Sequence, residues 1–275
     1  MSNQRLLLTP AEIWKLYDDT ERRLTTAVSE RMVDLAELRP GMRVLDLATG
    51  RGEPAIAAAR RVGPTGLVLG VDIAEAMLDM TRERAAREGL SNIDLRVLNA
   101  ERLDGVPNAH FHATLARWGL MYFDAPVAAL VAARKAMVPR GVMVAAFWAE
   151  PERVSYFTFP RRVLEKYLTL PALDAEAPGV FRYADVWRIE RDFTAAGFTI
   201  QSIEEMAVDV MEAATGEELV AWTRAFGLTR LLNGLPEDTQ RAWEADLVKQ
   251  AEQLWSGGMV RLGGVTRIVV ARSAE

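Results

Sequence analysis

The chain has no cysteine among its 275 residues and only two histidines, His110 and His112. Without thiols, disulfides, zinc–thiolate sites and cysteine nucleophiles are excluded. Because the histidines and carboxylates form no clustered ligand set, we expect no metal site. No apolar run approaches the ~20 residues that cross a bilayer, and the first residues lack the pattern of a signal peptide. We therefore expect a cytoplasmic protein without stable membrane association.

An excess of basic residues is also missing. The net charge is −5 and the pI is about 5.4, which disfavours a nucleic-acid partner because phosphate binding needs a basic face. We interpret the basic runs at residues 82–87 and 161–162 as solvated helix faces. Half of the residues are hydrophobic, as in ordinary globular proteins. The expected partner is a small molecule, and the sequence leaves a homo-oligomer open.

Short apolar runs alternate with helical patterns as far as residue 150. The runs predict strands at residues 43–48, 66–73, 93–99, 111–118 and 141–148. The helical patterns lie at residues 55–62, 76–88 and 127–137, whereas residues 100–110 look irregular. This alternation predicts an α/β fold with a doubly wound, Rossmann-like parallel sheet.

The two ends of the chain follow other patterns. Residues 1–38 predict two helices or one kinked helix, beginning with a capping box at Thr9. After residue 150 we expect strands at 198–210 and 265–272, separated by a helical block at 216–255. Two late strands around a helical insertion predict an antiparallel last strand on a mostly parallel sheet.

A glycine-rich turn follows the first strand. Gly50 and Gly52 let the backbone approach a ligand closely, and the helix behind them offers unpaired N–H groups. Asp72 ends the next strand, 20 residues beyond Gly52, where a carboxylate can bind both hydroxyls of a ribose. With Ala55 as the third small residue, the turn also fits the dinucleotide fingerprint. The local motif therefore predicts a nucleotide ligand without choosing among them.

A resemblance that extends over more of the chain indicates which nucleotide ligand is bound. Residues 46–52 (Asp-Leu-Ala-Thr-Gly-Arg-Gly) resemble the class I S-adenosylmethionine-dependent methyltransferase motif Asp/Glu-x-Gly-x-Gly-x-Gly. Residues 70–78, 99–101, 119–126 and 138–141 resemble motifs of the ubiquinone/menaquinone-biosynthesis-like group, so residues 38–150 are covered well. The resemblance implies methyl transfer to O, N or C of a small, largely apolar metabolite. The alternatives are a methyltransferase-like cyclase or binding protein that keeps the cofactor without methyl transfer, and an NAD-dependent oxidoreductase.

The resemblance also implies a division of the chain and a cofactor site. Residues 1–38 would form a helical lid, 39–150 the S-adenosylmethionine-binding core, and 151–275 the substrate-side insertions and final strand pair of the same domain. The implied cofactor-binding residues are Asp46, Ala48, Thr49, Gly50, Gly52, Asp72, Ile73, Met77, Asn99, Ala100, Glu101 and Arg117. Asp72 would hold the ribose, and Asn99 stands where the group usually has aspartate.

Residues that act on the acceptor should lie at the carboxyl ends of the strands, where open α/β sheets bind their ligands. The candidates at those ends are Trp118, Tyr122, Trp148 and Glu150, with Tyr17 on the lid. Aromatic faces would attract the sulfonium by cation–π interaction, and Glu150 is the best carboxylate for a base. His110 and His112 begin the fourth strand, nearly 20 Å from its active end at about 3.3 Å per residue. We therefore predict a structural role for both.

Overall fold

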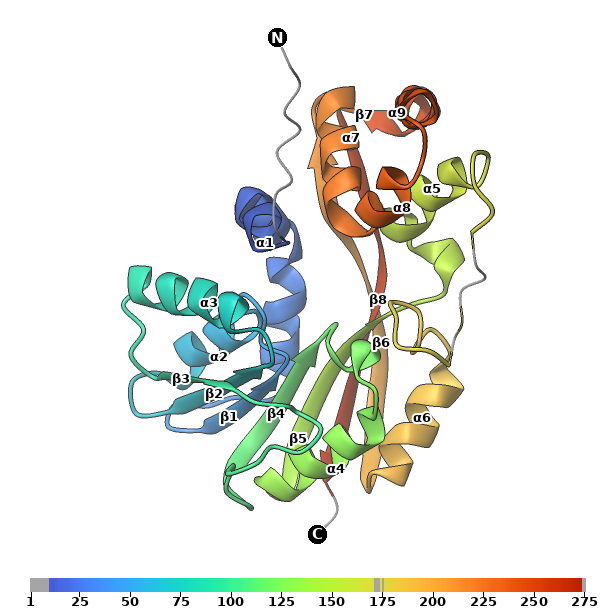
Figure 1. The fold of residues 1–275 in the computed structure, drawn as a ribbon. Helices are drawn as coiled ribbons and strands as arrows, with labels where there is room; N and C mark the ends of the chain where they lie inside the picture. Colours follow the sequence, from blue (N-terminus) through green and yellow to red (C-terminus); the bar gives the residue numbers. More distant parts are fainter. Residues whose placement is uncertain (1–9, 171–173, 175, 274–275) are drawn as a thin grey trace. The chain divides into compact units, whose positions relative to one another are not determined.

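The computed structural model describes residues 10–170, 174 and 176–273 (Figure 1). The chain divides into two compact units, each assembled from three segments. The first unit comprises Met1–Thr25, Pro151–Ala172 and Val208–Gly264, and the second comprises Thr26–Glu150, Leu173–Ala207 and Val265–Glu275. Within the described residues, no helix is both long and apolar enough to cross a membrane.

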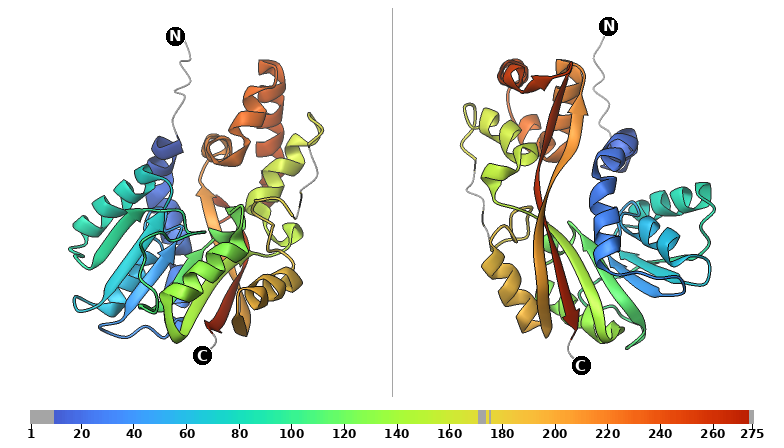
Figure 2. Two further views of the ribbon diagram at one scale, coloured as in Figure 1. Left: turned by 60° about the horizontal axis from the view of Figure 1, so that its bottom comes forward. Right: turned by 180° about the vertical axis from the view of Figure 1, so that it is seen from behind.

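The second unit is built on a mostly parallel sheet. Its parallel strands are β1 (Arg43–Leu47), β2 (Leu67–Asp72), β3 (Ile93–Val97), β4 (Phe111–Arg117) and β5 (Met137–Trp148). The order is β3-β2-β1-β4-β5-β8-β6, with β8 (Met259–Ser273) antiparallel to β5 and next to β6 (Phe198–Ala213), as Figure 2 shows. The predicted Rossmann-like sheet with an antiparallel last strand is confirmed. The strand order reverses between β1 and β4, which is where such sheets bind ligands.

Helices connect the parallel strands of this unit. They are α2 (Ala55–Val62), α3 (Glu75–Arg87) and α4 (Pro126–Ala136), with α6 (Val186–Ala195) later in the chain. Half of the α2 residues are alanines, and these buried alanines let the helix lie close to its neighbours. The connection at 98–110, described throughout, has neither helix nor strand, as expected for residues 100–110.

The first unit is mainly helical around an apolar core of its own. It contains the start of α1 (Pro10–Leu35), then α5 (Ser155–Leu164), α7 (Gly216–Thr223), α8 (Thr229–Asn233) and α9 (Glu237–Ala251). Trp222 and Trp243 are buried at its centre. The predicted helical block at 216–255 is present, although Pro236 separates α8 from α9. Tyr17 packs on Trp222 and Phe226, with ring centroids 4.4 and 5.5 Å apart.

Several boundaries differ from the sequence-based expectation. A single helix, α1, runs through Asp18, where a second start was expected; the expected capping box at Thr9 lies outside the described residues. Strand β5 begins at Met137 rather than 141, because Met137 pairs with Phe111 across an irregularity in the ladder. Strand β8 begins at Met259 rather than 265. A short strand, β7 (Trp255–Ser256), pairs with its start through a turn of two glycines.

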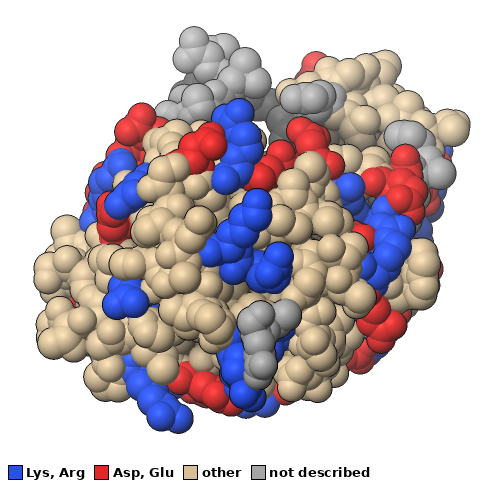
Figure 3. Space-filling view, turned by 90° about the horizontal axis from the view of Figure 1, so that it is seen from below, with Lys and Arg blue, Asp and Glu red and all other residues tan. Residues whose placement is uncertain are grey.

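Charged side chains of both signs are spread over the surface. On the face in Figure 3, Lys and Arg side chains lie among uncharged residues, with Asp and Glu also present. Arg82 pairs with Asp79 and Arg61 with Asp34, each at a partly exposed site, where such pairs contribute about 0–1 kcal/mol. This mixed pattern resembles an ordinary protein surface more than a basic stripe for phosphates.

Candidate active site

The turn after β1 folds tightly because three of its residues adopt left-handed backbone angles. The φ angles are +52° at Ala48, +53° at Gly50 and +94° at Gly52. The Thr49 N–H donates to the Val71 carbonyl at 3.0 Å, which anchors the turn to β2. A side chain on Gly52 would lie 2.9 Å from Thr81. The turn therefore needs glycine at position 52 for space as well as for conformation.

Ala48 occupies the place of the motif's first glycine. Gly119, which follows β4, leaves space for the Ala48 methyl group. A Cβ added to Gly119 would lie 2.6 Å from the Ala48 Cβ. Left-handed conformation costs an alanine roughly 1–2 kcal/mol. The departure from the motif at Ala48 is thus accommodated by the glycine facing it.

Asp72 organises the turn from the end of β2. One carboxylate oxygen accepts the Gly50 N–H at 2.9 Å, and the other accepts the Ala74 N–H at 2.9 Å. Each oxygen keeps a further lone pair for a ligand hydroxyl. Asp72 therefore both holds the turn and lines the pocket beside it.

Buried charges lie beneath the turn. Asp46 is fully buried; the Thr49 hydroxyl donates to one carboxylate oxygen, while the other has no hydrogen-bond partner within the described residues. Burial raises the pKa of Asp46 to about 7, against opposing effects of the Thr49 hydrogen bond and the Arg117 charge. Burial also acts to raise the pKa of Glu53, but Arg117 and Arg84 outweigh it and hold that pKa below its usual value.

Arg84 corrects the interpretation of residues 82–87 as a solvated face. The residue is only 5% exposed, and its guanidinium forms an ion pair with the buried Glu53 on the glycine turn. The pair ties α3 to the turn. A buried guanidinium needs such a partner because an unpaired charge there would be costly.

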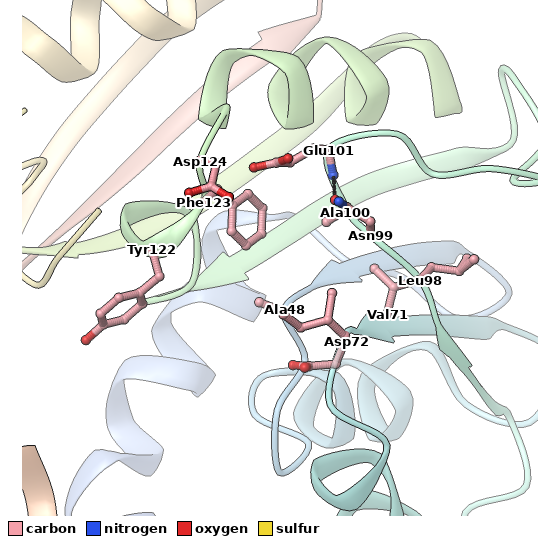
Figure 4. Close-up of a pocket in the computed structure, with 11 residues that line it drawn as sticks. Ala48, Val71, Asp72, Leu98, Asn99, Ala100, Glu101, Tyr122, Phe123 and Asp124 are labelled. Carbon is pink, nitrogen blue, oxygen red and sulfur yellow. Dashed lines mark hydrogen bonds between the residues drawn. The ribbon is translucent and has the colours of Figure 1, made fainter. Parts of the chain in front are cut away.

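A pocket opens at the carboxyl ends of β1, β2, β3 and β4 (Figure 4). Its volume of about 130 Å³ is roughly ten times what one water molecule needs. The lining residues are Ala48, Val71, Asp72, Ile73, Leu98, Asn99, Ala100, Glu101, Tyr122, Phe123 and Asp124. Ile73 is 76% exposed here, and a flat apolar ligand would remove that surface from water.

The pocket gathers many, though not all, of the predicted cofactor residues. Ala48, Asp72, Ile73, Asn99, Ala100 and Glu101 line it, whereas Asp46, Thr49, Gly50, Gly52, Met77 and Arg117 do not. Tyr122, predicted on the acceptor side, also lines it, which favours a role beside the cofactor. Phe123 and Asp124 were not predicted, although they directly follow Tyr122 in the motif at 119–126.

Two indoles stack at the ends of β4 and β5. The Trp118 and Trp148 rings are nearly parallel, 13° apart, with centroids 4.5 Å apart. Trp118 donates through Nε1 to the Thr266 hydroxyl at 2.9 Å, and the Arg117 guanidinium lies 4.8 Å from its ring centre. Trp118 also has a φ of +53°, a conformation rare for a bulky residue. Its ring is thus rigidly held and already in contact with a cation.

Glu150 follows β5 and forms an ion pair with Arg267 of β8. Arg267 is 4% exposed and also donates to Glu205 at 3.0 Å and to the Ala184 carbonyl. The charge-assisted bond holds the carboxylate in a defined position after β5. A carboxylate offers about four acceptor sites, so Glu150 can accept a hydrogen bond from a ligand while it is paired.

The histidines lie at the amino end of β4, as predicted. His112 accepts the Arg43 N–H through Nδ1 at 3.0 Å, and the His110 carbonyl accepts from the Arg43 side chain at 2.7 Å. Burial, followed by the nearby Arg43 and His112, lowers the pKa of His110. Both residues therefore join β4 to β1 at the edge opposite the pocket.

The chain is similar in sequence to known methyltransferases. Residues 38–156 match a family described as "Methyltransferase domain". The chain is 29% identical to nocamycin O-methyltransferase of Saccharothrix syringae over 255 residues, 89% of this chain and 90% of that protein. It is 32% identical to the ubiquinone/menaquinone biosynthesis C-methyltransferase UbiE of Cupriavidus metallidurans over 182 residues, 64% of this chain and 71% of that protein.

A solved structure is similar in fold. The SAM-dependent methyltransferase from Aquifex aeolicus superposes with a TM-score of 0.53 at 19% identity, covering 71% of this chain and 92% of that chain. The chain belongs to the class I S-adenosylmethionine-dependent methyltransferases, in their ubiquinone/menaquinone-biosynthesis-like group. It is a methyltransferase and its cofactor is S-adenosylmethionine. Methyltransferase activity therefore replaces both alternatives from the sequence, the cyclase or binding protein and the NAD-dependent oxidoreductase.

Proposed function

We propose that this methyltransferase acts on a small, largely apolar metabolite and that the attacked atom is a hydroxyl oxygen. The observation that carries the proposal is the extent of similarity to nocamycin O-methyltransferase, which spans 89% of the chain. That span includes most of the first unit. The similarity to the C-methyltransferase UbiE spans only 64%, which favours oxygen over carbon.

The first unit is rich in aromatic side chains. Tyr17, Tyr156 and Phe226 are partly buried and pack against its apolar core. Partly exposed aromatic groups of this kind favour an apolar acceptor, because small-molecule sites are lined mainly by apolar and aromatic side chains. The side chain of Trp14, a further residue of the expected lid, lies outside those described.

The residues of the second unit can hold and align the cofactor. Bound S-adenosylmethionine supplies an electrophilic methyl group, and transfer is an in-line displacement in which alignment carries much of the rate. We propose that Asp72 binds the ribose hydroxyls and that the ionised form of Asp46 attracts the ammonium of the methionine part. The stacked Trp118 and Trp148 would form a rigid wall, and Glu150, held by Arg267, would accept a hydrogen bond from the acceptor hydroxyl.

A product analysis tests the proposed function. The protein is incubated with methyl-labelled S-adenosylmethionine and panels of apolar phenols and enols, quinols with a free ring carbon, and secondary amines. The proposal expects methyl ethers from the phenols or enols, identified by mass spectrometry and by the NMR shift of the methyl group. Products methylated only on carbon or nitrogen would contradict it. The Asp72→Asn variant is the control for cofactor-dependent product.

A further inference from the structure

The adenine of the cofactor requires a hydrogen-bond acceptor from its pocket. Its exocyclic amine donates, whereas its ring nitrogens accept. The pocket lining offers several side chains with acceptor oxygens, including Asp72, Asn99, Glu101 and Asp124. Asp72 lies at the end of β2, where it serves the turn and the ribose. The choice for the amine is therefore among the other three.

The Asn99 side chain has a single acceptor atom, its amide oxygen, and one of the two lone pairs of that oxygen is already in use within the chain. The side-chain oxygen accepts the Glu101 N–H at 2.8 Å, shown as the dashed line in Figure 4. Because a backbone N–H can only donate, this bond distinguishes the amide oxygen from the nitrogen. The nitrogen is a donor only, so it cannot bind the amine of adenine. An aspartate here would have kept a second carboxylate oxygen for that purpose.

Glu101 is partly committed as well. One of its carboxylate oxygens accepts the Ala125 N–H at 2.7 Å. Ala125 is the N-cap residue of α4, which has no side-chain cap of its own. Glu101 thus satisfies a backbone donor at the beginning of a helix, where a negative charge is also favourable. The hydrogen bond with Ala125 therefore holds the Glu101 carboxylate at the start of α4.

Asp124 differs from Asn99 and Glu101 because neither of its carboxylate oxygens is engaged within the described chain. It lines the pocket beside Phe123, is exposed, and has no hydrogen bond or ion pair with the rest of the described chain. We infer that Asp124, rather than Asn99, accepts the hydrogen bond from the exocyclic amine of the adenine and so determines the preference for this base. The inference depends on the S-adenosylmethionine cofactor and is independent of the proposed acceptor.

Binding of two ligands that differ only at this group tests the inference. S-adenosylhomocysteine carries the amine, and S-inosylhomocysteine carries a carbonyl oxygen in its place. Isothermal titration calorimetry measures both affinities for the wild type, Asp124→Asn, Asn99→Asp and the double variant. We expect Asp124→Asn to weaken S-adenosylhomocysteine at least tenfold and S-inosylhomocysteine by less than threefold. In the double variant, Asn99→Asp should restore most of the lost affinity.

A matched control separates recognition from general charge effects. Asp104→Asn removes the same charge from an exposed residue that pairs with Arg102 outside the pocket, and it should change neither affinity more than twofold. Equal weakening of both ligands by Asp124→Asn, or no weakening of either, would overturn the inference. Wild-type protein that binds neither ligand would instead contradict the cofactor assignment.

Discussion

The contact between Ala48 and Gly119 shows how single residues set the geometry of the turn. The added Cβ on Gly119 has one severe clash, with the Ala48 Cβ at 2.6 Å, and its next contact is at an ordinary 3.5 Å. Gly119 itself has a φ of −103°, so the backbone does not require glycine there. Space alone therefore explains this glycine.

A double-mutant cycle should reveal this coupling. We expect Gly119→Ala to lower the free energy of unfolding by about 1–3 kcal/mol through overpacking. In an Ala48→Gly background the same change should cost less than about 0.5 kcal/mol, because the clashing methyl group is gone. Urea unfolding of the four proteins measures both values. Equal costs in the two backgrounds would show that the residues are not coupled.

The burial of Asp46 lowers the stability of the folded protein when its carboxylate is ionised. Its pKa is about 7 in the folded protein and about 3.9 in an unfolded chain. The folded state therefore binds more protons between these values, and the free energy of unfolding falls as pH rises from about 4 to 7. Under the proposed role of Asp46, its ionised carboxylate would attract a cationic cofactor, and a stability cost at this position would then serve function.

Asp46→Asn should therefore stabilise the protein at high pH. We expect the variant to exceed the wild type by about 1–4 kcal/mol at pH 8, with a smaller difference at pH 5, where much of wild-type Asp46 is protonated. Urea unfolding at the two pH values provides the measurement. A difference that does not change between pH 5 and pH 8 would show that Asp46 does not titrate in this range.

At the scale of elements, the direction of β4 separates structural from functional residues. Its carboxyl end leads to Trp118 and the pocket, and its amino end carries the histidines. His112 accepts a backbone N–H from β1, so its loss leaves a donor without that partner. Such a loss costs about 1–3 kcal/mol when the donor is buried.

His112→Ala should therefore affect stability and leave ligand binding intact. We expect the free energy of unfolding to fall by about 1–2 kcal/mol, while the S-adenosylhomocysteine dissociation constant stays within twofold. His112→Asn, whose amide oxygen can accept the same N–H, is the conservative control and should lose less. A tenfold weaker affinity in a folded variant would mean that the histidine influences the site.

The elements that sequence patterns predicted well are those governed by local signals. Apolar runs bounded by turns located β1 to β4. The glycine turn and Asp72, recognised by their spacing, lie at the pocket, which Ala48 of the turn and Asp72 both line. The start of β5 was predicted too late because Pro139 and Gly141 resemble a turn, whereas pairing of Met137 with Phe111 extends the strand. The partner of Glu150 could not be predicted, because Arg267 is 117 residues away in the chain.

At the scale of the whole molecule, the two units share no simple sequence boundary. Each is assembled from three segments, and the chain passes between them five times: within α1, β6 and β8, and also after Glu150 and after Ala172. A sequence pattern reports local structure, so it divided the chain into consecutive blocks at residues 38 and 150. The pocket described above is lined entirely by residues of the second unit. Cofactor binding should consequently stabilise the second unit against unfolding more than the first.

Hydrogen exchange with and without S-adenosylhomocysteine tests this expectation. At 100 times the dissociation constant, a ligand stabilises the state that binds it by about 2.7 kcal/mol, which slows exchange through unfolding about 100-fold. We expect this slowing for core amides of β1, β2 and β4. Amides of α9 should change little, because the first unit can open while the pocket stays formed. Equal slowing in α9 would show that both units open together, and selective slowing at residues 17–25 of α1 would support the predicted lid.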